Sequence, residues 1–591
     1  MTSGNGYCEV ISMKENEKYA YWLENLSEGS ELKKELEEIR GDEAAICDRF
    51  YQDIVFGTAG LRGICGAGTN RMNAYTVGRA TQGLAEYILA QDQSPAQKSD
   101  GTVPAAAGKN AAEKGVVIAY DCRYHSKEFS ELAAEILAGN GICVFLFPEL
   151  RPTPELSFAI RRMGAVSGIN MTASHNPKEY NGYKVYWEDG AQISGSVSQG
   201  IQEKIMQHGF FDAFPRMDLQ QAEKQGLVTV LGEDMDRQYL DYVESLAQHD
   251  GPELDLHVPV VYTPLNGAGS IPLRTVMRER GFDHFFIVPE QENPDPEFTT
   301  VGYPNPEDPR AFRLAEELGR QRHAAVLIAT DPDSDRMAVE IPDGSGGWTP
   351  LNGNQTGGLL IAYLAESRRE KGTLPEKSVM IRSIVTGDFG RTVCEDYGIR
   401  VVGALTGFKN ICGRIPELEK EGWTYFFGYE ESIGCAPGSE VRDKDGISAG
   451  MLIAEMAAYY AKAGRTLADV LDGLYRKYGY FAEKQISVVR KGQEGAVQIA
   501  RQMEAFRAEK PVSFGPFRVE KTIDYLHGYE DIPASNVLIY HMTDGSWFAV
   551  RPSGTEPKIK FYFYTRTADR ASSEERVEQL SKAVMDGLTV L

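Results

Sequence analysis

The stretch VVIAYDCRYHSKEFSELAAEILAGNGICVFLF, residues 116–147, indicates the fold class of this chain. It begins with an apolar strand at 116–120 and ends with a second one at 143–147. Between them, residues 128–141 carry apolar side chains at helical spacing. A strand, a helix and a strand in this order favour parallel strands with the helix packed on one sheet face.

The same unit recurs along the chain. Further apolar strands that end in Gly, Asp, Ser or Thr and precede an amphipathic helix or a polar loop are predicted at 258–262, 324–328, 379–384 and 400–403. The last hundred residues differ, with strands near 486–490, 537–542, 547–551 and 558–565 before a final helix at 572–588. We therefore predict an α/β protein: three related α/β domains with mixed sheets plus a smaller C-terminal α+β domain.

The predicted domain boundaries are 1–225, 226–350, 351–485 and 486–591. The first 50 residues favour a helical lead-in, since Glu and Lys are dense and apolar residues recur at helical spacing. Residues 91–115 are rich in Ala, Gly, Pro, Ser and Lys, and we interpret them as a surface insertion.

Composition excludes several functional classes. The 591 residues include 62 Lys and Arg against 85 Asp and Glu, a net charge of −23, which disfavours nucleic acid and anionic membranes as partners. No C-x-x-C pair occurs among the eight cysteines, so zinc motifs and a dense disulfide scaffold are not expected. With neither a signal peptide nor an apolar stretch of about 18 residues, we expect a cytoplasmic protein with reduced thiols.

The densest chemical signal is Thr172-Ala-Ser174-His175-Asn-Pro177, followed by Asn181-Gly-Tyr-Lys184. A serine on a polar turn after an apolar strand can carry a phosphoryl group, with Lys184 as a charge partner or proton carrier. The alternative is that Ser174 caps a helix while its neighbours satisfy backbone groups.

A second signal is Asp331-Pro-Asp333-Ser-Asp335-Arg336, directly after the strand at 324–328. Alternate carboxylates can converge on one hard cation, and oxygen ligands alone suit Mg²⁺ or Ca²⁺ rather than zinc. An EF-hand is excluded, because Arg336 and Pro342 stand where the loop needs Gly and Glu. The alternative is a solvated acidic turn.

Three further segments carry groups suited to a sugar phosphate. RPSGTEPK, 551–558, combines a guanidinium with hydroxyls and backbone N–H groups that can hold a phosphate dianion, although a turn with a stray Arg is the alternative. GYEESIG, 428–434, can bind sugar hydroxyls but is weak alone. FGTAGLRG, 56–63, is a Gly-rich turn that presents Arg62 and is not a Walker loop.

Together these segments closely resemble the α-D-phosphohexomutase family, in the right order over residues 50–565. The opening GTAGLRG and the TGFK at 406–409 look most like its phosphoglucomutase/phosphomannomutase branch, which is related to phosphopentomutases and glucose-1,6-bisphosphate synthase. The resemblance implies four domains around a central cleft. It also implies interconversion of glucose 1-phosphate and glucose 6-phosphate through a phosphoserine enzyme and a hexose 1,6-bisphosphate, with mannose phosphates as further substrates.

The resemblance also assigns roles. Ser174 would be the phosphoserine, and Asp331, Asp333 and Asp335 would bind Mg²⁺ with a phosphoserine oxygen. The catalytic surroundings would be Ser174, Arg62, His175, Lys184 and Lys409. The substrate-binding residues would be Arg336, Thr406, Gly407, Glu430, Ser432, Arg551, Ser553, Gly554, Thr555 and Lys558. Glucose 1,6-bisphosphate is expected as activator, and a small sugar phosphate as the partner of a monomer or homodimer.

One departure from the family bears on the sugar. Shorter bacterial phosphomannomutases carry His after the Gly of the loop that matches Thr406-Gly407, whereas this chain has Phe408 and Lys409. That resembles the glucose-directed members. The rival hypotheses are a phosphopentomutase or a bisphosphate synthase on the same scaffold, a metal-dependent phosphatase, and a non-catalytic Ca²⁺- or sugar-binding module.

Overall fold

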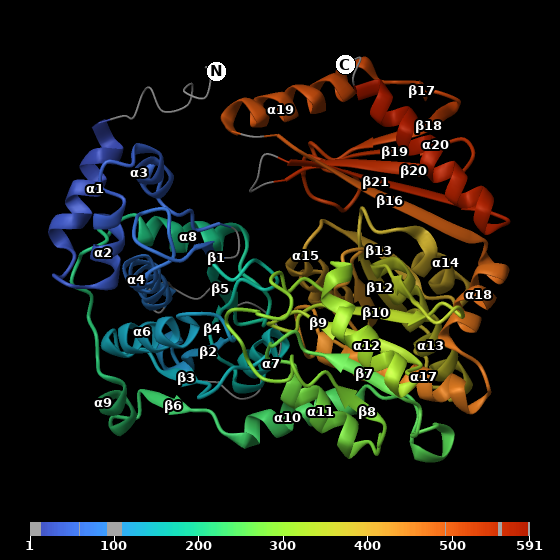
Figure 1. The fold of residues 1–591 in the computed structure, drawn as a ribbon, viewed down its shortest axis with the longest axis horizontal. Coiled ribbons are helices and arrows are strands. Elements are labelled where there is room, and N and C mark those ends of the chain that lie inside the picture. The colour runs from blue at the N-terminus through green and yellow to red at the C-terminus, as the bar shows by residue number, and fades with distance from the viewer. Residues whose placement is uncertain (1–12, 58–59, 92–108, 491, 554–557, 589–591) are drawn as a thin grey trace. The chain divides into compact units, whose positions relative to one another are not determined.

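The computed structural model describes residues 13–57, 60–91, 109–490, 492–553 and 558–588 (Figure 1). The chain forms two compact units whose segments alternate along the sequence. Unit 1 consists of residues 1–247, 256–340 and 436–454, and unit 2 of residues 248–255, 341–435 and 455–591.

The N-terminal segment is helical, as the sequence predicts. It forms α1 (Met13–Asn25), α2 (Glu31–Glu38) and α3 (Glu43–Phe50). Ser30 and Asp42 cap α2 and α3 by accepting backbone N–H bonds. Trp22 and Phe50 are buried and bring the helices together. Of the predicted insertion, residues 92–108 lie outside the described part, and α5 (Ala111–Lys114) follows it.

The first sheet has the strand order β1-β5-β4-β2-β3-β6. Strands β4, β2, β3 and β6 are parallel to one another. At one edge, β5 is antiparallel to both of its neighbours, β4 and β1. The strands are β1 (Gly60–Ile64), β2 (Val116–Tyr120), β3 (Val144–Leu146), β4 (Ser167–Met171), β5 (Tyr180–Trp187) and β6 (Val228–Val230). The associated helices are α4 (Ala74–Gln91), α6 (Ser126–Gly139), α7 (Thr153–Met163), α8 (Gly195–Ile205) and α9 (Leu219–Lys224). Every residue of β2 is buried, as the apolar run at 116–120 predicts for a parallel sheet covered on both faces.

The second sheet has the order β11-β10-β9-β7-β8, with β9, β7 and β8 parallel and β10 antiparallel to β9. Its strands are β7 (Val260–Thr263), β8 (Phe285–Ile287), β9 (Val326–Thr330), β10 (Met337–Pro342) and β11 (Trp348–Leu351). The helices of this region are α10 (Glu233–Ser245), η1 (Gly251–Glu253), α11 (Ser270–Glu279), η2 (Pro309–Phe312) and α12 (Arg313–Arg322).

The third sheet has the order β13-β12-β14-β15, and β12 is parallel to both β13 and β14. Its strands are β12 (Ser378–Ser383), β13 (Arg400–Ala404), β14 (Thr424–Tyr429) and β15 (Cys435–Ala436). The helices of this region are α13 (Gly353–Glu370), α14 (Asp388–Asp396), α15 (Phe408–Gly413), α16 (Ile415–Lys420), α17 (Gly446–Lys462) and α18 (Leu467–Tyr478).

The fourth sheet, β16-β21-β20-β19-β18-β17, is antiparallel throughout and carries α19 and α20 along one face (Figure 1). Its elements are β16 (Tyr480–Val489), α19 (Gly492–Glu509), β17 (Ser513–Phe514), β18 (Phe517–Asp524), β19 (Leu538–Met542), β20 (Trp547–Pro552), β21 (Lys558–Thr567) and α20 (Arg570–Leu588). Alternate residues face opposite sides, so Phe548 packs toward the helices while Trp547 packs with Val385 of the third domain.

This architecture of α/β domains with mixed sheets and a smaller C-terminal domain is the predicted fold class. Two sheets extend past the predicted boundaries: β6 pairs with β3 beyond residue 225, and β16 begins at Tyr480 rather than near 486. The polar run Glu483-Lys484-Gln485 interrupts the apolar pattern of β16, and the segment is a strand because its full length pairs with β21. Within the described residues, no helix is long and apolar enough to cross a membrane.

Candidate active site

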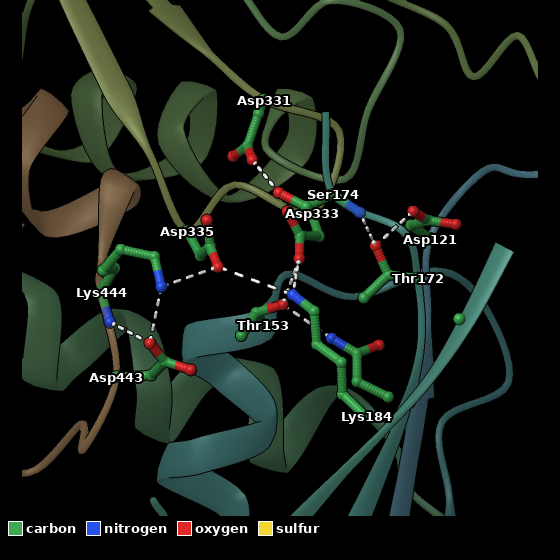
Figure 2. Close-up of polar contacts among 12 residues, drawn as sticks. Asp121, Thr153, Thr172, Ser174, Lys184, Asp331, Asp333, Asp335, Asp443 and Lys444 are labelled. Carbon is green, nitrogen blue, oxygen red and sulfur yellow. Dashed lines mark hydrogen bonds and ion pairs between the residues drawn. The ribbon is translucent and has the colours of Figure 1, made fainter. Parts of the chain in front are cut away.

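The predicted nucleophile Ser174 lies on the loop that joins β4 to β5. Its side chain is buried and its backbone has a φ of +53°, in the left-handed region. The backbone N–H of Ser174 donates to Thr172 Oγ1 at 2.8 Å, and Thr172 Oγ1 donates to Asp121 Oδ2 at 2.6 Å (Figure 2). Asp121, directly after β2, thus supports the serine loop through Thr172.

The three predicted metal ligands follow β9 and precede β10. Asp331, Asp333 and Asp335 are buried, and one carboxylate oxygen of each lies within 4.8 Å of the others. Oδ1 of Asp333 and Oδ1 of Asp335 accept no hydrogen bond from the described residues. Buried carboxylate oxygens without donors fit a hard cation such as Mg²⁺, which takes oxygen ligands.

The metal loop and the serine loop meet. Ser174 Oγ donates to Asp331 Oδ2 at 2.5 Å, and Figure 2 shows the two side chains pointing at each other. Burial and the neighbouring Asp333 and Asp335 raise the pKa of Asp331 well above its ordinary value. An added cation would relieve this repulsion, which is a second reason why the site fits a metal.

A close approach of backbones allows the metal loop to fold in this way. The backbone N–H of Ala268, between β7 and α11, donates to Pro332 O at 2.8 Å. A Cβ atom on the preceding residue, Gly267, would lie 2.4 Å from Pro332 Cα. Only glycine therefore fits at position 267.

Cations surround the carboxylates. Lys184 Nζ lies 2.7 Å from Asp333 Oδ2 and 3.7 Å from Asp335 Oδ2. Burial by itself lowers the pKa of Lys184, but these carboxylates outweigh it and raise that pKa, so the ammonium stays charged. Arg336 Nη1 donates to Ser174 Oγ at 2.8 Å. Of the two predicted residues, Arg336 therefore lies beside the nucleophile and Lys184 beside the predicted metal ligands.

Lys444 is a member of this cluster that the sequence reasoning missed. Its Nζ lies 3.1 Å from Asp335 Oδ2 and 2.9 Å from Asp443 Oδ1 (Figure 2). Burial raises the pKa of Asp335, but the cations, Lys444 first, outweigh it and lower that pKa. The available signal is the run of charged residues 442–445 directly before the apolar helix α17.

His175 is neutral in this environment. Burial and the charge of Arg336 lower its pKa to about 2. Arg336 Nη1 lies 2.6 Å from His175 Nδ1, so Nδ1 accepts this bond and the ring proton resides on Nε2. His175 therefore adds no positive charge next to Ser174.

Arg62 also reaches the serine loop. It lies on β1, opposite Gly182 of β5, and its Nη1 donates to Asn176 Oδ1 at 3.1 Å. The structure thus brings together, within unit 1, the predicted residues Arg62, Ser174, His175, Lys184, Asp331, Asp333, Asp335 and Arg336.

The predicted sugar-binding residues lie in unit 2. Glu430, at the end of β14, accepts the backbone N–H of Gly407 on Oε1 at 2.5 Å. Gly407 has a φ of +107°, which only glycine adopts readily, and it precedes α15 with Lys409. Burial lowers the pKa of Lys409. The loops that hold Thr406, Gly407, Lys409, Glu430 and Ser432 are therefore neighbours.

The predicted phosphate loop joins β20 to β21. Arg551 lies opposite Lys560 across these strands, and the N–H of Ser553 donates to Lys558 O at 2.7 Å. Gly554 and Thr555 lie outside the described residues.

The chain matches the profiles of one family along most of its length. They are described as phosphoglucomutase/phosphomannomutase α/β/α domain I (residues 101–211), domain II (237–344) and domain III (352–478), and the C-terminal domain (496–583).

Curated relatives and solved structures agree with this match. A phosphoglucomutase of Staphylococcus haemolyticus is 35% identical over 524 residues, covering 87% of this chain and 90% of the relative. One of Staphylococcus epidermidis is 36% identical over 520 residues, covering 86% and 90%. The crystal structure of parafusin, a phosphoglucomutase from Paramecium, has a TM-score of 0.65 at 17% identity and covers 90% of this chain and 94% of its own. A phosphoglucomutase/phosphomannomutase family protein from Burkholderia thailandensis also has a TM-score of 0.65, at 18% identity, and covers 91% and 98%.

Proposed function

Because this chain belongs to the α-D-phosphohexomutase family of isomerases, we propose that it interconverts glucose 1-phosphate and glucose 6-phosphate, with mannose phosphates as slower substrates. The curated relatives at 35% and 36% identity are named phosphoglucomutases, which supports glucose as the preferred sugar. Phe408 and Lys409, in place of the His of short phosphomannomutases, support the same choice.

Ser174 is the phosphoryl carrier in this proposal. The observation that carries it is the 2.5 Å contact of Ser174 Oγ with Asp331 Oδ2, inside a ring of buried carboxylates and cations. Asp331, Asp333 and Asp335, with an oxygen on Ser174, would hold Mg²⁺, which when bound neutralises charge on the transferring phosphoryl group. Lys184 and Arg336 add positive charge at the same position.

The remaining residues hold the sugar phosphate. Arg551, Ser553, Gly554, Thr555 and Lys558 would bind the phosphate that does not react, and Glu430 and Ser432 the sugar hydroxyls, next to Thr406 and Gly407. Arg62 and Lys409 would supply charge to the reacting phosphoryl group. A guanidinium with nearby hydroxyls and backbone N–H groups suits a phosphate dianion.

The reaction then consists of two phosphoryl transfers. The 6-hydroxyl of glucose 1-phosphate forms a bond to phosphorus while the bond from Ser174 Oγ breaks, which gives glucose 1,6-bisphosphate. This intermediate turns around, Ser174 Oγ forms a bond to the phosphorus of the 1-phosphate, and the bond from that phosphorus to O1 breaks. Glucose 6-phosphate leaves, and the proton that the 6-hydroxyl loses in the first transfer is balanced by the proton that O1 gains in the second. The transition state of each transfer is loose and anionic, so the residues act mainly by alignment and charge neutralisation. Exclusion of water protects phosphoserine from hydrolysis.

A coupled assay tests the substrate. We expect the highest kcat/KM on glucose 1-phosphate, a lower value on mannose 1-phosphate and little turnover of ribose 1-phosphate, with stimulation by glucose 1,6-bisphosphate. Chelation should abolish turnover and added Mg²⁺ should restore it, since three buried carboxylates would lose their counterion.

Other outcomes of this assay would contradict the proposal. Preference for ribose 1-phosphate would indicate a phosphopentomutase, and net formation of bisphosphate from a phosphoryl donor a synthase. Release of inorganic phosphate without isomerised product would indicate a phosphatase. Size-exclusion chromatography with light scattering would test the expected monomer or homodimer.

A further inference from the structure

One buried guanidinium group donates hydrogen bonds to several backbone carbonyls of the serine loop. Arg123, just after β2, has a side chain with no exposed surface. Its Nη1 donates to Pro177 O at 2.8 Å and to Tyr180 O at 3.0 Å. Its Nη2 donates to Ser174 O at 2.6 Å and to Asn176 O at 2.5 Å. Four carbonyl groups between Ser174 and the first residue of β5 therefore converge on a single side chain.

The loop needs such a partner because of its conformation. Ser174 occupies the left-handed region without being glycine, and such residues persist only where the surroundings fix them. The turn points the loop carbonyls inward, where each buried oxygen requires a donor. A planar guanidinium supplies several N–H groups in a fixed fork, whereas an ammonium supplies three donors from one point.

Arg123 is itself held from two sides. Its backbone N–H donates to Asp121 Oδ1 at 3.0 Å, and its Nε lies 3.3 Å from Asp121 Oδ2. On the other side, the ring of Phe298, from the long connection between β8 and η2, lies 5.1 Å from the guanidinium carbon. Phe298 is fully buried, so little room remains for another rotamer of Arg123.

We propose that Arg123 is a positioning residue for phosphoryl transfer: it fixes the Ser174 loop so that Oγ stays directed at Asp331 and Arg336 with and without the phosphoryl group. Its guanidinium contacts the loop backbone and not the Ser174 hydroxyl. This inference rests on the proposed role of Ser174 as phosphoryl carrier. It goes beyond that role, because it names the side chain that sets the geometry of the carrier.

The test compares Arg123→Lys with a matched control, Arg71→Lys. Arg71 is also a buried arginine of the first domain, and its Nη1 donates to the carbonyls of Asp48 and Asn70 at 3.2 and 2.9 Å. Both substitutions keep the positive charge and remove the fork. We expect similar melting temperatures for the two variants, but kcat about 100-fold lower for Arg123→Lys alone, with KM within about threefold, since misplacement by 1 Å can cost that much.

Two readouts separate positioning from general damage. Mass spectrometry after exposure to glucose 1,6-bisphosphate should show slow phosphorylation of Ser174 in Arg123→Lys and normal phosphorylation in Arg71→Lys. Free guanidinium ion should restore part of kcat in Arg123→Ala and none in Arg71→Ala. Equal kcat in the two lysine variants would overturn the inference.

If substitution of Arg123 prevents folding, Phe298→Leu provides a second test. This variant removes the aromatic ring that packs on the Arg123 guanidinium, and it should lower kcat about tenfold at constant KM. An unchanged kcat would then refute the inference. Failure of the proposed function is distinguishable, because wild-type protein would then neither isomerise hexose phosphates nor accept phosphate on Ser174.

Discussion

Two residues with left-handed backbones stand at the candidate centre. Ser174 has a φ of +53° and Ser334, in the metal loop, has a φ of +54°. Conformations of this kind cost about 1–3 kcal/mol each and occur where the surrounding structure fixes them. Here the supports are Arg123 and Thr172 for Ser174, and Asp331 O for the N–H of Ser334 at 2.8 Å. Strain at both loops is consistent with a site built for fixed geometry.

Replacement of Ser174 tests the carrier directly. We expect Ser174→Ala to lose mutase turnover completely, because among the described residues no other hydroxyl donates to the Asp331 carboxylate, and to retain its fold. The control is Ser167→Ala on β4, whose Oγ donates to Tyr186 O at 2.7 Å away from the metal loop. The measurements are the coupled assay and circular dichroism. Wild-type activity in Ser174→Ala would refute the assignment.

At this scale the sequence predicts the site unevenly. Ser174 and the three aspartates lie in short motifs that follow predicted strands. Their roles can therefore be predicted from the local sequence. The local sequence does not predict the roles of Lys444 and Arg123. Lys444 approaches Asp335 only through tertiary folding, and Arg123 looks like an ordinary charged residue until its four carbonyl partners are known.

Among the elements, β10 carries an unusual buried acid. Glu340 is 2% exposed, and its Oε2 accepts no hydrogen bond from the described residues. Burial, with a smaller effect of Glu316, raises the pKa of Glu340 to about 7. Since the folded pKa lies above the unfolded value of 4.5, the charged form disfavours folding.

The stability of the protein should therefore fall as pH rises from about 4.5 through 7, by about 3 kcal/mol from this group. Glu340→Gln has no such loss, so it should stabilise the protein at pH 8 and have little effect at pH 4.5. Urea unfolding at both pH values measures the difference. Glu317→Gln, on the exposed side of α12, is the control and should show no such pH dependence. Equal stability of Glu340→Gln and wild type at pH 8 would contradict this account.

The elements themselves were mostly predictable. Most residues of the parallel strands are apolar and the helices have clear periodicity, so local pattern suffices for both. The sequence does not predict the first half of β16 because Glu483, Lys484 and Gln485 are poor strand formers, and pairing with β21 supplies what propensity does not.

For the whole molecule, the third and fourth domains share one hydrophobic core inside unit 2. Trp547 and Tyr564 stack with ring centroids 4.2 Å apart, and Trp547 Nε1 donates to Asp388 Oδ2 at 2.7 Å. Tyr564 Oη donates to Val385 O at 2.6 Å. The C-terminal sheet is thus joined to the β12–α14 connection by both apolar and polar contacts.

Trp547→Ala should weaken this junction by about 3–5 kcal/mol, the usual cost of removing a buried tryptophan. We expect faster hydrogen exchange in β20 and in residues 385–389, measured by mass spectrometry, with β9 unchanged. Phe548→Ala is the control, since its ring faces α19 and α20 and should loosen the fourth domain without the 385–389 effect. Unaltered exchange at 385–389 in Trp547→Ala would show that the junction does not depend on this side chain.

The chain passes from unit 2 into unit 1 after residue 435 and returns after residue 454, within α17. Inside unit 1, buried hydrogen bonds hold residues 436–454 in place. Tyr186 Oη donates to Asp443 Oδ2 at 2.8 Å, and Tyr239 Oη donates to Asp445 Oδ1 at 3.0 Å. A crossover between homologous genes within this segment would separate partners that must match. A chimeric enzyme that takes residues 436–454 from a relative therefore keeps these bonds only where the relative also carries the acids that Tyr186 and Tyr239 need.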